Sequence, residues 1–324
     1  MFQPQWHRDQ NHKWKKIGVQ TKQKPPLDRW KTMGFYFPEG YLEIWVDMNH
    51  KKTPVRLLDT KGRIQYQYWA NAIQKQRIQH WKHLQLISPF FESHLLPQLK
   101  YINSKTWERE DVIRLMIQCS LDCGIRSGHP KYRDENQSYG ICTLETRHVR
   151  AYPSWKNPEQ IRIHFPGKKQ VLNECNCIIN QALLRYGVWR REQKTQTNAF
   201  WMDSNQKTIQ PSDLNEWLQT NVHPTMRMKD LRTWLIHRHS LEILSKIPQT
   251  ERETEKQLKQ SWKRAIIDIA EQTHHTPKIC ESSYLCPSVR YAWMNQKRPF
   301  HKVNFPAVKT YSKWICYLWK MKYF

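Results

Sequence analysis

The spacing of apolar residues changes once along the chain, and this change limits the folds that the chain can adopt. Before Trp69, short runs rich in β-branched and aromatic residues alternate with polar breaks that contain Gly, Asn and Asp. These runs are residues 41–46, 54–58 and 63–69. After Trp69 most of the spacing is helical. We therefore predict an α+β protein with a small β-rich domain at residues 25–72 and a larger, mostly helical domain at residues 73–324.

The helical pattern is clearest in three segments of the larger domain. One amphipathic helix is predicted to follow Thr106, a candidate N-cap, because acidic residues favour its first turn and its apolar residues recur at helical spacing. Those apolar residues are Val112, Leu115, Met116 and Cys119. Two further helices are predicted at residues 229–246 and 251–273. The apolar face of the second is formed by Trp262, Ile266, Ile267, Ile269 and Ala270.

Strand-like runs return between residues 139 and 175, which predicts one small sheet within the helical domain. The runs read YGICTLE, HVRAY, QIRIHF and KQVLNE. The Pro-Gly-Lys sequence between the last two is expected to form a hairpin turn. At the ends of the chain we predict a flexible basic arm over residues 1–24, which have no sustained period, and a capping helix in the aromatic tail, YSKWICYLWKMKYF.

The charge of the chain predicts a polyanionic partner. The 53 Lys and Arg residues outnumber the 28 Asp and Glu residues, which gives a formal net charge of +25 over 324 residues. Nucleic acid is the expected partner of such a chain, and the alternative is an enzyme of another kind with a solvated basic surface. No apolar run is long enough to cross a bilayer, so no membrane partner is expected.

Cysteine and glycine usage indicates which cofactors to expect. The eight cysteines are scattered without a CxxC pair and without a secretory signal peptide, so we expect reduced thiols in an intracellular, non-secreted protein. Cys175 and Cys177 are spaced poorly for zinc, and we interpret them as packing residues; no metal site is predicted. The nine glycines form no phosphate-binding loop. We therefore expect no bound nucleotide and no cofactor.

Several stretches, taken in order, resemble the type IB DNA topoisomerases, in particular the compact form of poxviruses and some bacteria. The resemblance covers about residues 25–290 and depends on short motifs that follow one another in the family's order. They are KGRIQYQY at 61–68, IRSG at 125–128, SYGICTLETRHV at 138–149, HFPGKKQ at 164–170, KDLRTW at 229–234 and HTPKICESSY at 275–284. The resemblance implies the tyrosine recombinase/topoisomerase IB catalytic fold, and a clamp around duplex DNA.

The resemblance also implies a catalytic set. Tyr284 would be the nucleophile that forms a 3′-phosphotyrosyl link, and Lys168 the acid that protonates the leaving 5′-oxygen. Arg126, Arg232 and His275 would donate hydrogen bonds to the phosphate, because charge builds up on its oxygens during attack. Each residue alone has a plainer interpretation: a surface cation, a turn lysine, a residue preceding a helix N-cap, or a core tyrosine. The five in order favour the catalytic interpretation.

The implied substrate is double-stranded DNA, bound by a monomer that acts wherever the DNA is: in a nucleus, a viral factory or virion, or a bacterial cytoplasm. The implied activity is the relaxation of supercoils without ATP or metal, through cleavage of one strand, rotation and religation. The positions that match the family's DNA contacts are Gln65, Tyr66, Tyr68, Tyr132 and Lys229. For the residues around 65–68, the alternative is a strand with alternating aromatic packing.

Three positions depart from the family pattern, and two other classes of protein remain open. His274 stands where a Gly often precedes the catalytic His, Lys169 follows the presumed acid and is a fallback for it, and His237 replaces a small residue or Asn. A tyrosine recombinase shares the catalytic plan but usually has a His where Lys229 stands here, and it lacks a KGRIQYQY domain. A DNA-binding protein without activity is the third possibility.

Overall fold

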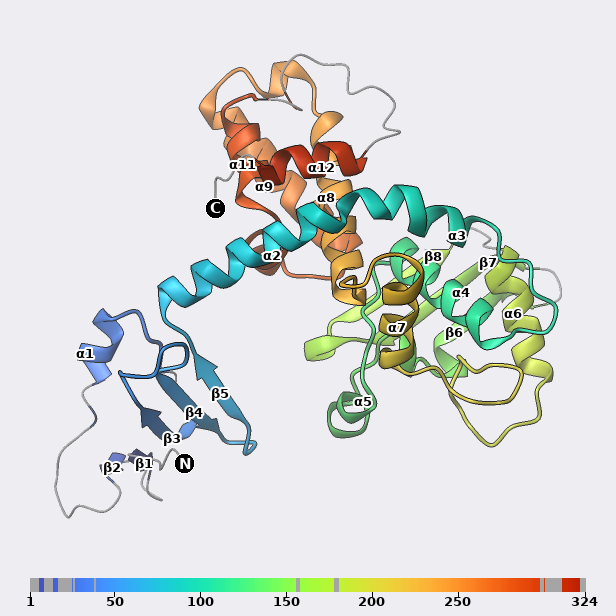
Figure 1. Cartoon of the computed structure of the whole chain (residues 1–324), viewed down its shortest axis with the longest axis horizontal. Coiled ribbons are helices and arrows are strands. Elements are labelled where there is room, and N and C mark those ends of the chain that lie inside the picture. The colour runs from blue at the N-terminus through green and yellow to red at the C-terminus, as the bar shows by residue number, and fades with distance from the viewer. Residues whose placement is uncertain are drawn as a thin grey trace. The chain divides into compact units, whose positions relative to one another are not determined.

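The computed structural model describes residues 6–8, 14–16, 25, 27–37, 39–155, 158–177, 181–297, 300 and 311–320 (Figure 1). The chain divides into two compact units, Met1–His80 and Trp81–Phe324. The division lies within helix α2 (Ala70–Phe90), a few residues beyond the boundary expected from the change in apolar spacing. The predicted mixture of a small β unit and a larger, mostly helical one is confirmed. None of the described helices combines the length and apolar character needed to cross a membrane.

The first unit is an antiparallel sheet with the strand order β2-β1-β3-β4-β5. Its elements are β1 (Trp6–Arg8), β2 (Trp14–Lys16), α1 (Leu27–Thr32), β3 (Tyr41–Val46), β4 (Val55–Asp59) and β5 (Ile64–Gln67). Alternate residues of β3 and β4, among them Ile44, Val55 and Leu57, are buried against Trp30 and Phe35. The first two predicted strands, β3 and β4, therefore pack through one apolar face. The third predicted strand, β5, pairs with β4 but buries none of its residues.

The expectation of a flexible arm does not hold for two segments of residues 1–24. Strand β1 pairs with β3 through Trp6 and Ile44, and β2 pairs with β1. Trp6 is buried in the core of this unit. Strands of three residues are too short to produce a period-two signal, so the sequence pattern did not reveal them.

The second unit contains most of the helices and a three-stranded antiparallel sheet with the order β6-β7-β8. The strands are β6 (Val149–Pro153), β7 (Pro158–Pro166) and β8 (Leu172–Cys177), with a 3-10 turn, Lys168–Gln170, between β7 and β8. The long helices are α4 (Arg109–Asp122), α6 (Gln181–Glu192), α7 (Pro211–Asn221), α8 (Met228–Ser245), α9 (Glu255–Gln272) and α12 (Tyr311–Lys320). The short ones are a π-helical turn (Phe91–Leu95), α3 (Leu96–Lys100), α5 (Pro130–Asn136), α10 (Pro277–Ile279), a second π-helical turn (Cys280–Tyr284) and α11 (Pro287–Met294).

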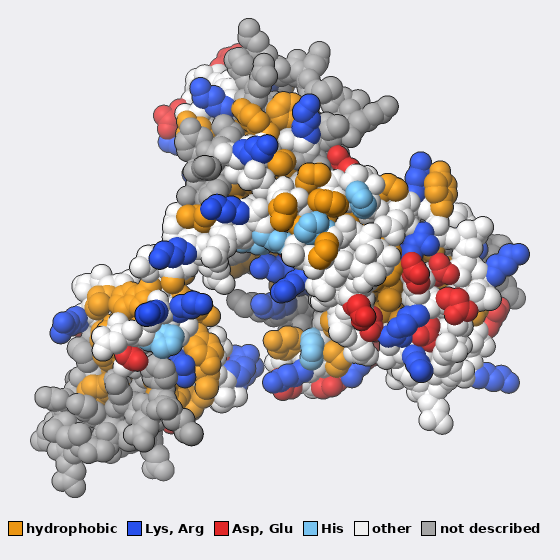
Figure 2. Space-filling view, viewed as in Figure 1, with side chains coloured by type: hydrophobic (Ala, Val, Ile, Leu, Met, Phe, Trp, Pro, Cys, Tyr) orange, Lys and Arg blue, Asp and Glu red, His pale blue; other side chains and the backbone are white. Residues whose placement is uncertain are grey.

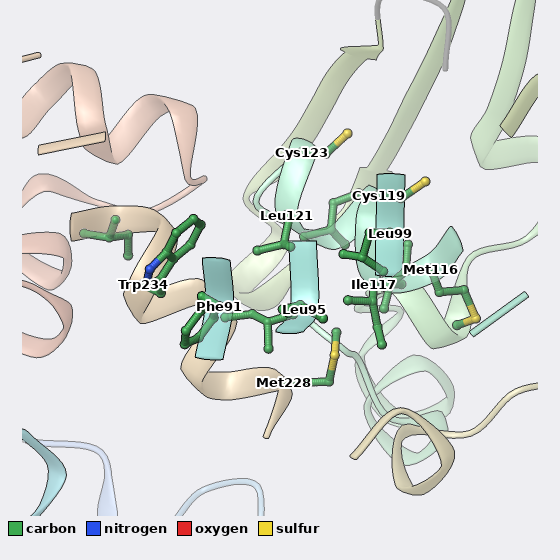
Figure 3. Packing of buried hydrophobic residues seen from close by; sticks show 14 of the residues in the cluster. Phe91, Leu95, Leu99, Met116, Ile117, Cys119, Leu121, Cys123, Met228 and Trp234 are labelled. Atoms are coloured by element: carbon green, nitrogen blue, oxygen red, sulfur yellow. The ribbon is translucent and has the colours of Figure 1, made fainter. Parts of the chain in front are cut away.

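The core of this unit fixes α8 in place. Figure 3 shows Phe91 and Leu95 pointing toward Trp234 and Met228 of α8, with residues of α4 such as Ile117 close by. The rings of Phe91 and Trp234 stack with centroids 4.9 Å apart and an angle of 2° between their planes. Because α8 is packed against neighbours on several sides, the polar side chains that it carries have little freedom to move.

Two helices agree with the predicted pattern and differ from it in detail. The predicted stripe of α4 is buried, but the helix begins after Glu108 rather than at Thr106. Trp107 has a φ of 56°, and such a left-handed residue interrupts any helix that starts before it. In α9 the expected apolar face is buried except for Ile267, which is 37% exposed because it is offset by about 100° from Ile266.

The prediction of a strand at YGICTLE is wrong. Ile141–Thr143 forms a 3-10 turn, and a second 3-10 turn follows at Thr146–His148. The backbone N–H of Ile141 donates to the carbonyl of Arg126 at 2.7 Å, and that of Cys142 donates to the carbonyl of Ser127 at 2.8 Å. The segment therefore pairs with the irregular chain around Arg126, and this partner lies too far away in sequence for local spacing to indicate it.

The expectation that all cysteines are reduced is also wrong for one pair. Cys123, at the end of α4, is joined by a disulfide to Cys175 of β8, with 5.5 Å between their Cα atoms. The described cysteines Cys119, Cys142, Cys280, Cys286 and Cys316 are not disulfide-bonded. The side chains of Cys177 and Lys169 lie outside the described residues. The disulfide forms because the hairpin passes the end of α4, which the sequence spacing did not indicate.

The aromatic tail forms a helix, as predicted, over the part that the structure describes. Helix α12 contacts α8 and α11 and buries Ile315, Leu318 and Trp319. Residues 321–324 lie outside the described residues.

Candidate active site

The segment from His275 to Tyr284 folds as a short helical stretch that begins just after α9. The side chain of Thr276 caps α10 by accepting a hydrogen bond from the backbone N–H of Ile279, and Pro277 occupies the first helical position. Tyr284 is the last residue of the following π-helical turn. The rings of His275 and Tyr284 are in contact, with centroids 4.4 Å apart and an angle of 52° between their planes. The spacing of nine residues therefore brings both side chains to one place.

Arg232 of α8 lies against this pair and is only 7% exposed. Its Nε donates to Nε2 of His275 at 3.1 Å, and its Nη1 donates to the carbonyl of Gly124 at 2.7 Å. Its Nη2 donates to the carbonyl of Thr273. The Cζ atom lies 5.9 Å from the centroid of the Tyr284 ring. One guanidinium thus connects α8 with the ends of α4 and α9, and holds its positive charge beside the phenol.

Burial and like charges determine the protonation of these groups. Burial, together with repulsion from Arg126, lowers the pKa of Arg232 to about 9, so Arg232 stays protonated at neutral pH. Burial and the two arginines lower the pKa of His275 to about 2. The imidazole of His275 is therefore neutral, and its Nε2 lone pair accepts the hydrogen bond from Arg232.

Arg126 is positioned by an irregular segment whose glycines are required by close packing. Gly128 has a φ of +73°, a conformation that side chains disfavour. A Cβ atom on Gly140 would lie 2.5 Å from the backbone N of Gly128 and 2.6 Å from the carbonyl oxygen of Arg126. The IRSG and SYG motifs therefore meet backbone to backbone, and this contact determines the direction of the Arg126 segment.

The guanidinium of Arg126 retains an unused donor. Its Nε is buried and has no hydrogen-bond partner among the residues that the structure describes. Buried donors are nearly always paired in folded proteins, and an arginine N–H forms its strongest hydrogen bonds with an anionic acceptor. The same residue contributes to the lowered pKa values of Arg232 and His275, which places its charge near both.

Lys168 reaches the same region from the β7–β8 hairpin. It is the first residue of the 3-10 turn and is exposed. Together with Gly167 it lines a small cavity that is also bordered by Arg126, Tyr139 and His274. The hairpin turn and the Arg126 segment therefore border one space. The structure thus brings together all five residues of the predicted catalytic set within the second unit.

The predicted DNA-contacting residues are exposed and belong to both units. In the first unit, Tyr66 of β5 is 46% exposed, Tyr68 is 43% exposed, and Gln65 is also exposed. Because β5 buries none of its residues, the alternative of a strand with alternating aromatic packing does not describe it. In the second unit, Tyr132 on α5 and Lys229 in the first turn of α8 are exposed. Basic side chains are spread over the visible face of both units (Figure 2).

The sequence did not indicate the backbone acceptors that fix the site. The carbonyls of Gly124 and Thr273 receive the hydrogen bonds of Arg232, and the carbonyl of Cys123 receives one from Nε2 of His274. The glycine that directly precedes the IRSG motif was the available signal, since Gly124 has a φ of +60°. Every residue has a backbone carbonyl, so the sequence does not show which carbonyls accept hydrogen bonds from side chains.

An α+β chain with two arginines, a histidine and a lysine around one tyrosine has the arrangement expected of an enzyme that cleaves DNA through tyrosine. The family model for the catalytic core of eukaryotic DNA topoisomerase I matches residues 99–289, and the chain belongs to this type IB topoisomerase family. It is similar to DNA topoisomerase 1B of Acanthamoeba polyphaga mimivirus, with 26% identity over 300 residues and 85% of each chain covered.

Family membership decides between the classes that the sequence left open. The protein is a DNA topoisomerase, an isomerase that acts on DNA, and not a member of the recombinase class. The matched range contains Arg126, Lys168, Arg232, His275 and Tyr284.

Proposed function

We propose that the protein relaxes supercoiled duplex DNA by transient cleavage of one strand, with Tyr284 as the nucleophile and without ATP or a metal ion. The observation that carries this proposal is the contact of Tyr284 with His275 and Arg232, beside the buried and unpaired Nε of Arg126. Three phosphate-binding groups around one phenol are what attack on a phosphodiester requires.

The proposed reaction conserves the number of phosphoester bonds. The Oη of Tyr284 attacks the phosphorus, a 3′-phosphotyrosyl bond forms, and the bond to the 5′-oxygen of the next nucleotide breaks. The leaving oxygen takes a proton, and the phenol loses one. The free 5′ end then rotates about the intact strand, and its hydroxyl attacks the phosphotyrosyl bond to restore the DNA. Because each step replaces one ester by another, no external energy source is needed.

The cations have distinct roles in this proposal. Arg126 and Arg232 present planar donors that match phosphate oxygens. The neutral His275 accepts from Arg232, so it donates to a nonbridging oxygen only after it gains a proton on Nε2. A phosphate placed between them would raise the pKa of His275 and favour that proton, since it adds negative charge beside a ring that faces two cations.

Lys168 is proposed as the general acid for the leaving 5′-oxygen. Its place on the hairpin turn, where it borders one cavity with Arg126, supports this role. A lysine ammonium can give its proton to the developing alkoxide while the phosphate remains bound by the arginines. Lys169 lies next to it and is the proposed fallback.

DNA binding is proposed to involve both units, with the duplex held in a clamp by a monomer. The exposed Gln65, Tyr66 and Tyr68 would contact the duplex from the first unit, and Tyr132 and Lys229 from the second. If the protein neutralises about eight phosphates, log affinity falls with log salt concentration at a slope of about −7. The site of action is proposed to be wherever the DNA lies inside the cell.

The test is relaxation of a supercoiled plasmid in EDTA without ATP. The native chain should relax the plasmid, and Tyr284→Phe should not, although it should still bind DNA because only the nucleophilic oxygen is removed. Tyr101→Phe is the matched control, because Tyr101 is 74% exposed and does not belong to the catalytic set. Relaxation by Tyr284→Phe would contradict the assignment of the nucleophile. Failure of the native chain to relax the plasmid would contradict the proposed activity.

A further inference from the structure

His237 lies in the middle of α8 and is completely buried. Its Nε2 accepts the backbone N–H of Cys286 at 3.0 Å and the indole N–H of Trp319 at 3.1 Å. Its Nδ1 lies 2.8 Å from the carbonyl oxygen of Thr233, one turn earlier in the same helix. One imidazole thus joins α8, the chain that follows Tyr284, and the carboxy-terminal helix α12.

These contacts define the protonation of the ring. A nitrogen that accepts two N–H groups has no proton of its own, so the ring is neutral and its proton is on Nδ1, which donates to Thr233. The rings of Trp81 and Trp319 pack edgewise on the imidazole, with centroids 5.6 Å and 5.0 Å from its own. In such an apolar environment an N–H group without an acceptor costs free energy. The N–H groups of Cys286 and Trp319 therefore favour the position in which both donate to the imidazole.

The contacts of His237 link the helix that carries Arg232 to the segment that follows Tyr284. Arg232 precedes His237 by five residues on the same rigid helix, and Cys286 follows Tyr284 by two residues. Leu285, between them, is 3% exposed and extended, with its backbone N–H donated to the carbonyl of Cys280. The segment that carries Tyr284 is therefore attached to the Arg232 helix on both sides, through the His275 contact before it and the His237 contact after it.

We propose that His237 is a positioning residue for Tyr284, and that α12 takes part through Trp319. This proposal rests on the function proposed above, in which Tyr284 is the nucleophile. His237 holds the end of the π-helical turn at a fixed distance from α8. Trp319 of α12 donates to the same imidazole and keeps it in place. Displacing a nucleophile by about 1 Å can slow a reaction about a hundredfold, so such a contact can affect the rate without touching DNA.

The experiment compares single-turnover cleavage of a suicide duplex by His237→Leu and His237→Gln. Leucine fills much of the space but accepts no hydrogen bond, so the cleavage rate constant should fall about tenfold to a hundredfold. DNA affinity should stay within about twofold, because no DNA contact is removed. Glutamine carries an oxygen that can accept both N–H groups, and it should bring the rate to within about threefold of the native value.

A control variant separates positioning from folding stability. Ser240→Ala removes a buried hydroxyl that donates to the backbone carbonyl of His237 at 2.7 Å, and it leaves the imidazole contacts in place. Its melting temperature should fall, but its cleavage rate well below that temperature should equal the native rate. If His237→Leu behaves in the same way as Ser240→Ala, His237 is merely structural and the proposal is overturned.

A second variant and a spectrum keep the proposal testable if His237→Leu does not fold. Trp319→Phe keeps an aromatic ring but removes the indole N–H, and it should slow cleavage a few-fold in the same direction. A native cleavage rate in Trp319→Phe would overturn the role of α12. Long-range ¹H–¹⁵N spectra of the native protein should show His237 protonated at Nδ1, and protonation at Nε2 would overturn the proposed contacts.

The proposed function and this inference fail in different ways. If Tyr284→Phe still forms the covalent adduct, the nucleophile is another residue and the proposed function fails. If Tyr284→Phe forms no adduct, and His237→Leu and Trp319→Phe both cleave at the native rate, only the positioning role fails.

Discussion

The two arginines of the site are held in opposite ways. Arg232 lies in a buried helix, and one N–H of each of its three nitrogens is used by the Gly124 carbonyl, the Thr273 carbonyl or His275. Arg126 lies in an irregular segment and keeps a buried Nε without a partner among the described residues. Lys168, on the same side, is an exposed turn residue. The helical half of the site is thus part of the core, whereas the loop half keeps the Nε of Arg126 available for a ligand.

The largest effect on rate is expected in the loop half. Lys168→Ala should slow cleavage about 10² to 10⁴-fold, because the leaving 5′-oxygen loses its proton donor. Unfolding should be unchanged, since the side chain is exposed. Single-turnover cleavage of a duplex with a better leaving group at the scissile position should largely restore the rate. A variant that is equally slow on both duplexes would contradict the role of Lys168 as the acid.

Alanine substitution of each arginine tests the comparison directly. Arg232→Ala and Arg126→Ala should each slow cleavage about 10² to 10³-fold, because each removes a donor to the phosphate. Only Arg232→Ala should also lower the free energy of unfolding, by about 1 to 3 kcal/mol, because it leaves buried carbonyls without donors. Arg126→Ala should stay within about 0.5 kcal/mol of the native protein.

Urea unfolding measured beside single-turnover cleavage gives both quantities for the two arginine variants. If Arg232→Ala and Arg126→Ala lost the same free energy of unfolding, both arginines would be equally part of the core. The proposed difference between the two halves of the site would then be wrong.

The disulfide joins the two halves, and its removal should lower the stability of the protein. Cys123 directly precedes Gly124, an acceptor of Arg232, and Cys175 lies on the strand that leaves the Lys168 turn. The bond closes a loop of 52 residues, so Cys175→Ser should lower the free energy of unfolding by about 2 to 4 kcal/mol. The native protein should lose the same amount in a reducing agent.

Two comparisons check that assignment. Cys175→Ser itself should not respond to the reducing agent, and Cys316→Ser, at a free thiol, should respond as the native protein does. A native protein whose unfolding is the same with and without the reducing agent would show that the bond does not contribute to stability.

The sequence predicted the parts of the fold that are encoded locally. The strands at 41–46 and 54–58, the stripe of α4, and the helix at 229–246 each depend on a repeated apolar spacing within one element. The five residues of the predicted catalytic set followed from motifs in order, and the structure places them in one region of the second unit. The start of the helical stretch between His275 and Tyr284 was also predictable, because Thr276 and Pro277 are a typical N-cap and N1 pair.

The parts that could not be predicted depend on partners that are distant in sequence. The segment 139–145 has strand-like composition but bonds to the chain around Arg126. Cys123 and Cys175 meet only because a hairpin passes a helix end. The two partners of the Nε2 atom of His237 lie 49 and 82 residues away, so the sequence alone marked this residue only as a departure from the family pattern. Such contacts are properties of the assembled unit rather than of any local pattern.

The smallest expected effect concerns His274, at the boundary between the two halves. His274 has a φ of 53°, a left-handed conformation that costs a residue with a side chain about 1 to 2 kcal/mol and that glycine adopts readily. The position at which the family pattern has a glycine is therefore left-handed in this chain. In this chain the cost is offset by the hydrogen bond from Nε2 of His274 to the carbonyl of Cys123, at 3.1 Å. Burial lowers the pKa of His274, so the neutral ring makes this bond.

Two substitutions at residue 274 separate these contributions. His274→Ala loses the hydrogen bond and keeps the backbone strain, whereas His274→Gly loses the bond but relieves the strain, at the cost of a more flexible unfolded chain. We therefore expect His274→Gly to be more stable than His274→Ala by about 1 kcal/mol or less, with both below the native protein, in urea unfolding at neutral pH. If alanine were the more stable of the two, the left-handed conformation would not be what favours glycine at this position, and the hydrogen bond to Cys123 would not be offsetting any strain.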